Sequence, residues 1–336
     1  MPYNSKFGQV VYAAGEDDDA DAAAAFPVQN LSYNVENTQE IVNNLNRGSG
    51  LPGRSRPGSK FAETSFEMEL IGTDTADEPT PLGSLFRAVG FAESAPTGST
   101  PNIYFDYTLN NNAAAFRTLA NSGNIDHVDL TVNLGQTLNA AAATQTYACT
   151  NMVARSANFR WAQNEIPRVA FDFVGIGAGT AIASGFGAGV NAAWTATADP
   201  VNSDNLSLTW GGVTLVVRSF EIQITNTVNQ RPDRNTVLGY ATPMVTGRDV
   251  VYTLEYETVP VATWNPGTLF QAGTKQALSL VYNTAGGVRN KTTITSDAYV
   301  NTSDQPSPDS DNIQVSTVTL RQSRTSGDEL LISYAA

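Results

Sequence analysis

Histidine and cysteine each occur once in this sequence, as His127 and Cys149. Hydrolytic triads usually need a histidine, and Asp126 and Asp129 flank this one in "NIDHVDLTVN". In a strand, only Asp129 would share the face of His127, because side chains alternate. Cys149 and His127 could form a nucleophilic pair, but a lone cysteine in the alternating run "TYACTNM" is more often a small packed residue. We therefore expect no catalytic residue and no enzyme.

Two further patterns could bind a cofactor or a metal ion. Gly175, Gly177 and Gly179 in "FVGIGAGT" resemble half of a dinucleotide fingerprint, but no third glycine at the right spacing and no βαβ pattern follow. The acidic stretches "EDDDAD" (16–21) and "SDQPSPDSDN" (303–312) could hold calcium, but neither has the spacing of an EF-hand. Solvated loops explain both stretches better, so we expect no cofactor and no metal site.

Composition limits the remaining classes of protein. The chain has 336 residues and a net charge of −13, which argues against a sequence-independent nucleic-acid clamp. It contains no apolar run long enough to span a bilayer, and its N-terminus lacks the pattern of a secretory signal. A single cysteine excludes an intrachain disulfide. We expect a protein that folds in a cytoplasm and is held together by packing.

The elements that would position any site are mostly strands. Period-two alternation predicts strands over residues 65–72, 102–109, 127–134, 168–176, 206–210, 219–227, 251–258 and 312–320. Turn residues separate most of these runs, which is typical of antiparallel sheets. The predicted fold class is all-β, an antiparallel sandwich or partial barrel with one or two short helices.

One short helix interrupts this pattern at "PTPLGSLFRAVGF" (79–91). Prolines suit its start, and Gly90 can form a left-handed C-cap. Four apolar residues share one face, which we expect to pack on a sheet: Leu82, Leu85, Phe86 and Val89. A second copy of the frame, "NPGTLFQAG", places Leu269 and Phe270 in the same roles.

The two helices belong to a longer repeated pattern. "LSYNVENTQ" and "FEIQITNTVNQ" each precede a long loop, an alternating strand and the helix frame. We interpret this as a strand, long loop, strand and helix unit used twice, over about 28–175 and 206–336 of one domain. Residues 1–27 form an N-terminal arm, and the Gly/Ala-rich stretch 175–205 a loop or insertion.

Charges gather in two of the loops. Residues 47–60 carry Arg47, Arg54, Arg56 and Lys60 among Gly, Pro and Ser, with no acid. Near the N-terminus an acidic cluster comprises Asp17, Asp18, Asp19 and Asp21. Either both are solvated loops of arbitrary charge, or the basic loop of one copy meets the acidic cluster of another.

In order, these motifs resemble the major tail tube proteins of long-tailed bacteriophages. The resemblance covers roughly residue 28 to the C-terminus, and it rests on "TSFEMELIG", "PLGSLFRAVGF", "YACTNMVARSANFRWAQNEIPRVAFDFVGIG" and "VTGRDVVYTLEYE". It implies two orthogonally packed antiparallel sheets flanked by a helix. Inner strands of neighbouring copies join into rings, usually of six copies, which stack into a tube around genomic DNA. Since each repeat holds half of a domain's strands, six copies are favoured here.

The resemblance also implies roles and partners. The loop 39–60 would reach the adjacent ring, where Arg47, Arg54, Arg56 and Lys60 would meet Asp17, Asp18, Asp19 and Asp21. Net negative charge would line the bore, so that double-stranded DNA passes without specific binding. Partners would be further copies, the tail tip or initiator, the tape measure and the tail terminator, in a virion assembled in the host cytoplasm and probably non-contractile in type. Two alternatives stay open: a capsid decoration or neck protein, and a secreted β-sandwich adhesin or binding module.

Overall fold

Antiparallel strands make up most of the computed structural model. It describes residues 8–13, 24–41, 55–70, 80, 82–94, 97–99, 102–109, 127–134, 145–162, 165–181, 206–233, 235, 239–281, 292–300, 305–308, 313–323 and 330–335. All eighteen strands belong to one hydrogen-bonded sheet, and two short helices accompany them. This confirms the all-β fold class. Neither helix in this part of the chain is long and apolar enough to cross a membrane.

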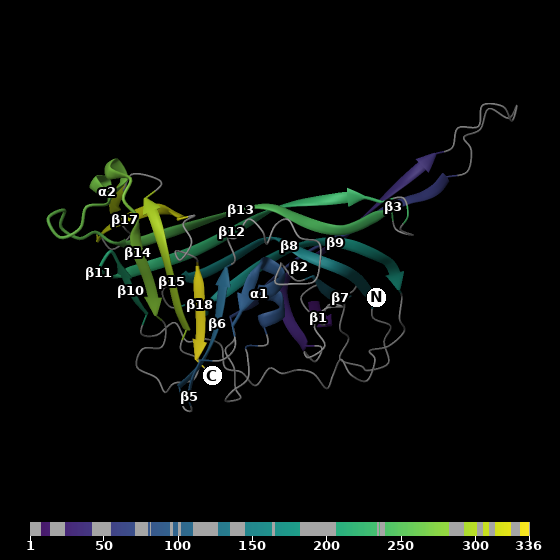
Figure 1. Ribbon diagram of the computed structural model, residues 1–336, viewed down its shortest axis with the longest axis horizontal. Coiled ribbons are helices and arrows are strands. Elements are labelled where there is room, and N and C mark those ends of the chain that lie inside the picture. The colour runs from purple at the N-terminus through teal and green to yellow at the C-terminus, as the bar shows by residue number, and fades with distance from the viewer. Residues whose placement is uncertain are drawn as a thin grey trace, which may run out of the picture.

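Eight strands form a long antiparallel sheet across the molecule (Figure 1). Their order follows from the ladders: β2-β3-β9-β8-β12-β13-β17-β16. The strands are β2 (Ala24–Ile41), β3 (Ser55–Glu69), β9 (Arg168–Ala181), β8 (Gln145–Ala162), β12 (Val217–Pro232), β13 (Tyr240–Glu257), β17 (Gln314–Gln322) and β16 (Gln305–Pro308). Both predicted halves of the chain thus contribute to one sheet, which we call the long sheet.

The other strands pack against the long sheet or close it. β1 (Gly8–Ala13) pairs with β2 and with β7 (Val128–Leu134), and β7 pairs with β8, so that six strands of the first half form a closed circuit. A second series runs β4/β5-β6-β18-β15-β14-β10-β11. Its strands are β4 (Phe91–Glu93), β5 (Thr97–Ser99), β6 (Asn102–Leu109), β18 (Leu331–Ala335), β15 (Thr292–Val300), β14 (Gln276–Val281), β10 (Ser207–Trp210) and β11 (Val213–Leu215).

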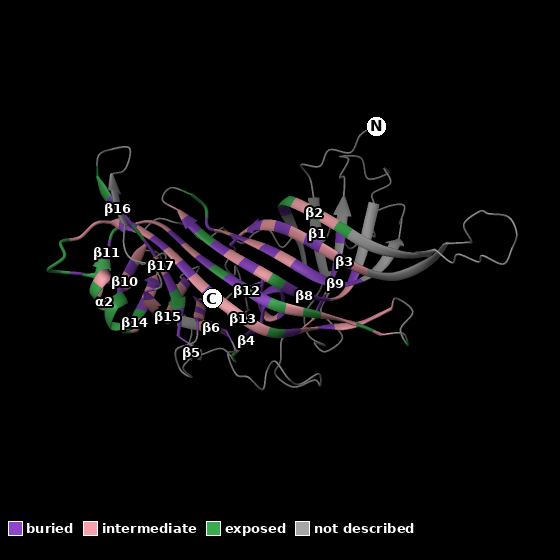
Figure 2. Cartoon of the chain, turned by 90° about the horizontal axis from the view of Figure 1, so that it is seen from above, coloured by how far each residue is buried: buried purple, intermediate pink, exposed green. Residues whose placement is uncertain are grey.

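Alternation in the sequence decides which face of the long sheet is buried. Along residues 61–70, every even-numbered residue is buried and every odd-numbered one is partly exposed. The same alternation in β12 and β13 buries Phe220, Ile222, Tyr252 and Leu254. Figure 2, seen from above, shows buried and more exposed residues alternating along these strands. One face therefore packs on the core, and the other stays polar.

The two helices differ in their surroundings. α1 (Gly83–Val89) lies beneath the middle of the long sheet, and Phe86 packs against the rings of Tyr107, Phe159 and Tyr334. Tyr334 comes from β18, so the two halves of the chain enclose α1 together. α2 (Pro266–Ala272) lies at one end of the molecule (Figure 1), where only Pro266 of the helix is buried.

Three of the expected loops are wrong in extent. The loop expected over 39–60 is shorter, because Gln39, Glu40 and Ile41 pair with Pro57, Arg56 and Ser55. In the second half, strand pairing replaces most of the loop expected after Thr227, up to Pro232↔Tyr240. β9 continues through Ala181 into the Gly/Ala-rich stretch. Glycine and proline suggested loops there, but two long antiparallel strands keep pairing with each other beyond the body of a sheet, and bulges absorb the irregular residues.

Candidate functional site

The residues that could have formed a nucleophilic site have structural contacts instead. Cys149 is buried opposite Leu130, and burial raises the pKa of its thiol to about 12. Nε2 of His127 lies 3.1 Å from the carbonyl oxygen of Pro243. A carboxylate oxygen of Asp129 accepts a hydrogen bond of 2.8 Å from the backbone N–H of Asn151, whose φ of 53° marks a bulge in β8. These contacts stabilise a strand irregularity, and none of them activates a nucleophile.

The glycine motif and the acidic clusters give no ligand site in the described residues. A Cβ at Gly175 would come within 2.9 Å of the backbone oxygen of Asn151 and would also meet the sulfur of Met152. Glycine is therefore required there for close packing of β8 and β9. Within the ranges that the structure describes, no group of three His, Cys, Asp or Glu residues is placed to hold a metal ion.

The solvent-facing side of the long sheet, which we call the polar face, is the most charged feature of the described chain. Its carboxylates outnumber its guanidinium groups, and both lie at the non-buried positions of the alternating strands: Glu63, Glu67, Glu69, Asp172, Glu221, Asp249, Glu255 and Glu257 against Arg155, Arg160, Arg168, Arg218 and Arg321. A polyanion approaching this face would meet a net negative surface.

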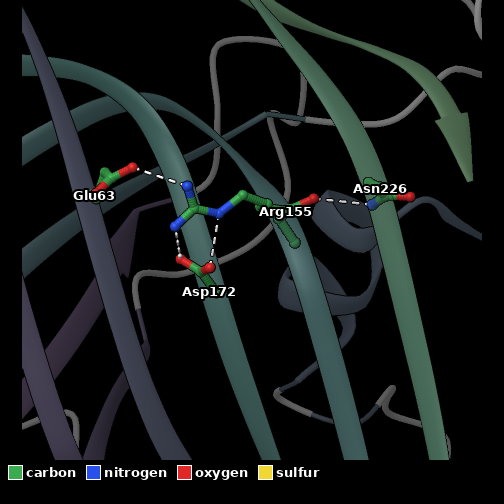
Figure 3. Close-up of polar contacts among 5 residues, drawn as sticks. Glu63, Arg155, Asp172 and Asn226 are labelled. Atoms are coloured by element: carbon green, nitrogen blue, oxygen red, sulfur yellow. Dashed lines mark hydrogen bonds and ion pairs between the residues drawn. The ribbon is translucent and has the colours of Figure 1, made fainter.

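Arg155 is the clearest example of how the guanidinium groups of the polar face are held (Figure 3). Its Nε and Nη2 donate to the two carboxylate oxygens of Asp172 at 2.8 and 3.2 Å, and its Nη1 donates to Glu63 at 2.9 Å. The fork therefore joins β8 to β9 and β3. The hydrogen bond to Asp172 raises the pKa of Arg155 above its usual value, so the group is a permanent cation.

Other charged side chains of the polar face also pair across strands. Arg321 donates two hydrogen bonds to Asp249, at 2.9 and 2.7 Å. Nδ2 of Asn158 on β8 donates to Glu221 on β12 at 2.6 Å, across the junction between the two halves. These arginines thus already have carboxylate partners, and a phosphate would have to compete with those partners.

The junction of the two halves has a polar centre below the sheet. β8 and β12 pair over seven residues, from Ser219↔Ala162 to Thr225↔Ser156. At the next position, Nδ2 of Asn226 donates to the carbonyl oxygens of Val89 and Ala154, each at 2.9 Å (Figure 3 draws the second bond). Val89 is the last residue of α1, so the contact fixes that helix to the long sheet.

Arg248 on β13 completes this centre. Its Nε donates to Oδ1 of Asn226 at 2.8 Å, and its Nη2 donates to the carbonyl oxygen of Val89 at 2.8 Å. A cation at a helix C-terminus is electrostatically favourable. Burial alone lowers the pKa of Arg248 to about 10, which still leaves the side chain charged at neutral pH.

A polar, carboxylate-rich sheet face with no catalytic or metal-binding group is a feature of an assembly protein. The sequence model of the family described as phage tail tube protein matches residues 9–320. The chain belongs to the phage tail tube protein family. The chain matches no curated protein sequence. Family membership makes it a structural protein of the virion tail that assembles into a tube and associates with other tail proteins.

The structure places only some of the expected contact residues. Arg47, Arg54 and the cluster Asp17, Asp18, Asp19 and Asp21 lie outside the described residues. Arg56 and Lys60 lie on β3, where only the backbone is described. The expected inter-ring contact between these groups stays a prediction for this tail tube protein.

The helix residues differ between the two helices. Leu82, Leu85, Phe86 and Val89 of α1 are all buried, with exposed fractions of 0 to 1%. Leu269 of α2 is partly buried against the core, whereas 45% of Phe270 is exposed, so the expected packing of Phe270 is wrong for the single chain. The likeness of the two helix frames predicted equal burial, but nothing in one copy covers α2 as β18 covers α1.

Sequence reasoning missed Arg155, Asn226 and Arg248. Arg155 gave no signal, because an arginine in a strand does not reveal its cross-strand neighbours. Asn226 did give one, since an Asn-Thr pair follows an alternating strand in both halves, in "VENTQ" and "ITNTV".

Proposed function

We propose that copies of this chain form stacked rings whose long sheets join into the wall of a hollow tube, and that genomic DNA passes through its bore during delivery into the host. The observation that carries the proposal is the polar face of the long sheet, where arginines are held by cross-strand carboxylates. Facing the bore, it would present a net negative, hydrated surface to DNA. Such a surface repels phosphates and allows the molecule to slide.

The proposal also assigns the finer roles. The chain is a non-enzymatic subunit of a non-contractile tail, assembled in the host cytoplasm. It contacts the tail tip or initiator, the tape measure and the tail terminator at the ends or inside of the tube. The wall of each ring contains six four-stranded units, which the sequence expectation assigns to six copies.

Electron microscopy tests the assembly directly. The purified chain is concentrated and imaged by negative stain, with and without a tail-tip extract to start assembly. Rings or uniform hollow tubes support the proposal. Discrete particles under both conditions would contradict it and favour a decoration, neck or adhesin protein.

A DNA-binding measurement tests the role of the polar face. The double variant Glu63→Gln/Asp172→Asn removes both carboxylates that hold Arg155 and reduces the negative charge of the face by two. We expect tubes of this variant to bind double-stranded DNA at least about tenfold more tightly at low salt, with a steeper salt dependence. Glu165→Gln, in the β8–β9 turn, is the charge control and should leave binding weak. Equal binding by both variants would place the polar face outside the bore.

A further inference from the structure

We propose that the α2 end of one copy binds the β2–β3 edge of the next copy in the way that the α1 region binds β12–β13 within the chain, so that three copies close a ring. The inference deepens the proposed function, on which it rests, by naming the contact surface and the partner. The partner is a second copy of this chain, and the template for the contact is the junction between β8 and β12.

The long sheet consists of two four-stranded units with the same order. β2-β3-β9-β8 forms the first unit and β12-β13-β17-β16 the second. β3 ends at Glu69 opposite Arg168, where β9 begins, and β13 ends at Glu257 opposite Val315, near the start of β17. A seven-residue helix follows each of these strands. Each chain therefore supplies two equivalent units to a tube wall.

Both outer edges of this series lack a neighbour among the described strands. Residues 29–41 of β2 pair with β3 alone, and β16 pairs with β17 alone. In the interior of the series, the equivalent strands β12 and β8 pair with each other. The edge of β16 in one copy and the edge of β2 in the next can therefore make the same ladder, and such pairing removes edges that would otherwise aggregate.

The register places the right side chains at the open edge. In the first unit, Asn37 lies opposite Lys60, as Asn226 lies opposite Arg248 in the second unit. Arg248 and Asn226 bind the C-terminal carbonyl group of α1, at Val89. Asn37 and Lys60 of a second copy would meet the corresponding carbonyl group of α2, at Ala272, with an amide and a cation of the same type.

Burial of the two helices agrees with one filled and one open junction. Phe86 of α1 is fully buried, while its counterpart Phe270 in α2 is 45% exposed. This difference is not a general property of that end of the chain. Ile166 and Ile313 occupy equivalent positions in the β8–β9 and β16–β17 turns and are 43% and 39% exposed. The excess exposure therefore belongs to α2, where the second copy would dock.

Counting copies is the first experiment. Rings or short tubes of the full chain are measured by native mass spectrometry and by electron microscopy with symmetry analysis. Three copies of the 35.7 kDa chain per ring, with pseudo-sixfold density, are expected. Six copies per ring would overturn the inference and leave the tube function intact, whereas no rings under any assembly condition would contradict the tube function itself.

Two variants test the contact surface. Phe270→Asp and Lys60→Glu should each raise the concentration needed for assembly about tenfold or more, with far-UV circular dichroism and thermal midpoint unchanged. Ile166→Asp, which alters an equally exposed apolar side chain away from the contact, should assemble like the wild type. If Phe270→Asp unfolds the chain, Lys60→Glu and the conservative Lys60→Arg decide. Normal assembly of Lys60→Glu would overturn the proposed contact.

A disulfide trap measures the register of the ladder. Glu221 lies opposite both Thr253 and Arg160. Its counterpart in the first unit is Ser32, opposite Ser65, and Ser307 corresponds to Arg160.

The variant Ser32→Cys/Ser307→Cys in a Cys149→Ala background should therefore link copies on oxidation. Linked species up to a trimer are expected on a denaturing gel. The control Ser32→Cys/Thr317→Cys, one strand further in, should not link, because disulfides need Cα atoms within about 7 Å. Linked species beyond three copies, or equal linking by the control, would contradict the model of the ring.

Discussion

α1 and α2 have similar sequences but different environments. Both contain a Gly, Ser or Thr, Leu, Phe frame and end at a glycine, and both follow the second strand of a long hairpin. α1 is enclosed by both halves of the chain, and only Arg87 of its residues is not buried, while α2 is mostly exposed. The difference teaches that a helix frame determines which side chains can pack, while the neighbouring strands determine whether they do.

The same comparison separates folding from assembly. Contacts of α1 with β8, β12, β13 and β18 hold the two halves of one chain together. At α2, the equivalent contacts would come from another copy. We therefore expect substitutions at α1 to affect the stability of the chain and substitutions at α2 to affect mainly its assembly.

The largest expected effect is that of Phe86. Phe86→Ala should lower the free energy of unfolding by about 3–5 kcal/mol, because it leaves a cavity among four aromatic rings. Phe270→Ala should cost less than about 1 kcal/mol, since almost half of that side chain is already exposed. Denaturant unfolding of the two variants measures the difference. The stronger change Leu85→Asp/Phe86→Asp should prevent soluble folding. A soluble, ring-forming double variant would refute this account of α1.

Asn226 is expected to have the next largest effect. Asn226→Ala would leave the carbonyl oxygens of Val89 and Ala154 without these donors and would remove the acceptor for Nε of Arg248. Loss of such buried hydrogen bonds costs about 1–3 kcal/mol. Asn229→Ala, three residues along the same strand at an exposed position, is the control and should change stability by less than about 0.5 kcal/mol. Urea denaturation would test both, and equal losses would deny the polar centre its role.

The helix ends give the smallest predicted difference. Gly90 has a φ of 113° and Gly273 a φ of 59°, both in the left-handed range. Asparagine tolerates the conformation of Gly273, and a Cβ there meets no atom within 4 Å. We expect Gly273→Asn to be near neutral and Gly90→Asn to cost about 1–2 kcal/mol, since φ near 113° is open mainly to glycine. Thermal unfolding would measure both changes, and a larger cost at Gly273 would contradict the expectation.

Much of the fold follows from local patterns in the sequence. Alternation predicted the positions of β3, β6, β7, β9, β12, β13 and β17, because a half-buried strand needs apolar residues on one face. The prolines, the apolar spacing and Gly90 predicted α1, and Gly90 is its left-handed C-cap. The lone His127 and Cys149 were correctly interpreted as structural, since neither has the partners that catalysis needs.

Other features depend on contacts between distant residues. Strand lengths were underestimated wherever glycine or proline interrupted a ladder, as at Pro57, because a partner strand can accommodate an irregular residue. The fork of Arg155 joins Glu63 and Asp172, which are 92 and 17 residues away in sequence. No local pattern predicts that combination.

By itself, the sequence determined the all-β class, the position of α1 and the family resemblance, because these depend on residue type and short-range spacing. It also displayed a repeated frame that suggested two equivalent helices. Only the tertiary structure decided that one of them is buried and the other exposed. The burial of a side chain depends on which strands pair across the sheet, and that pairing is set by long-range packing of the whole chain.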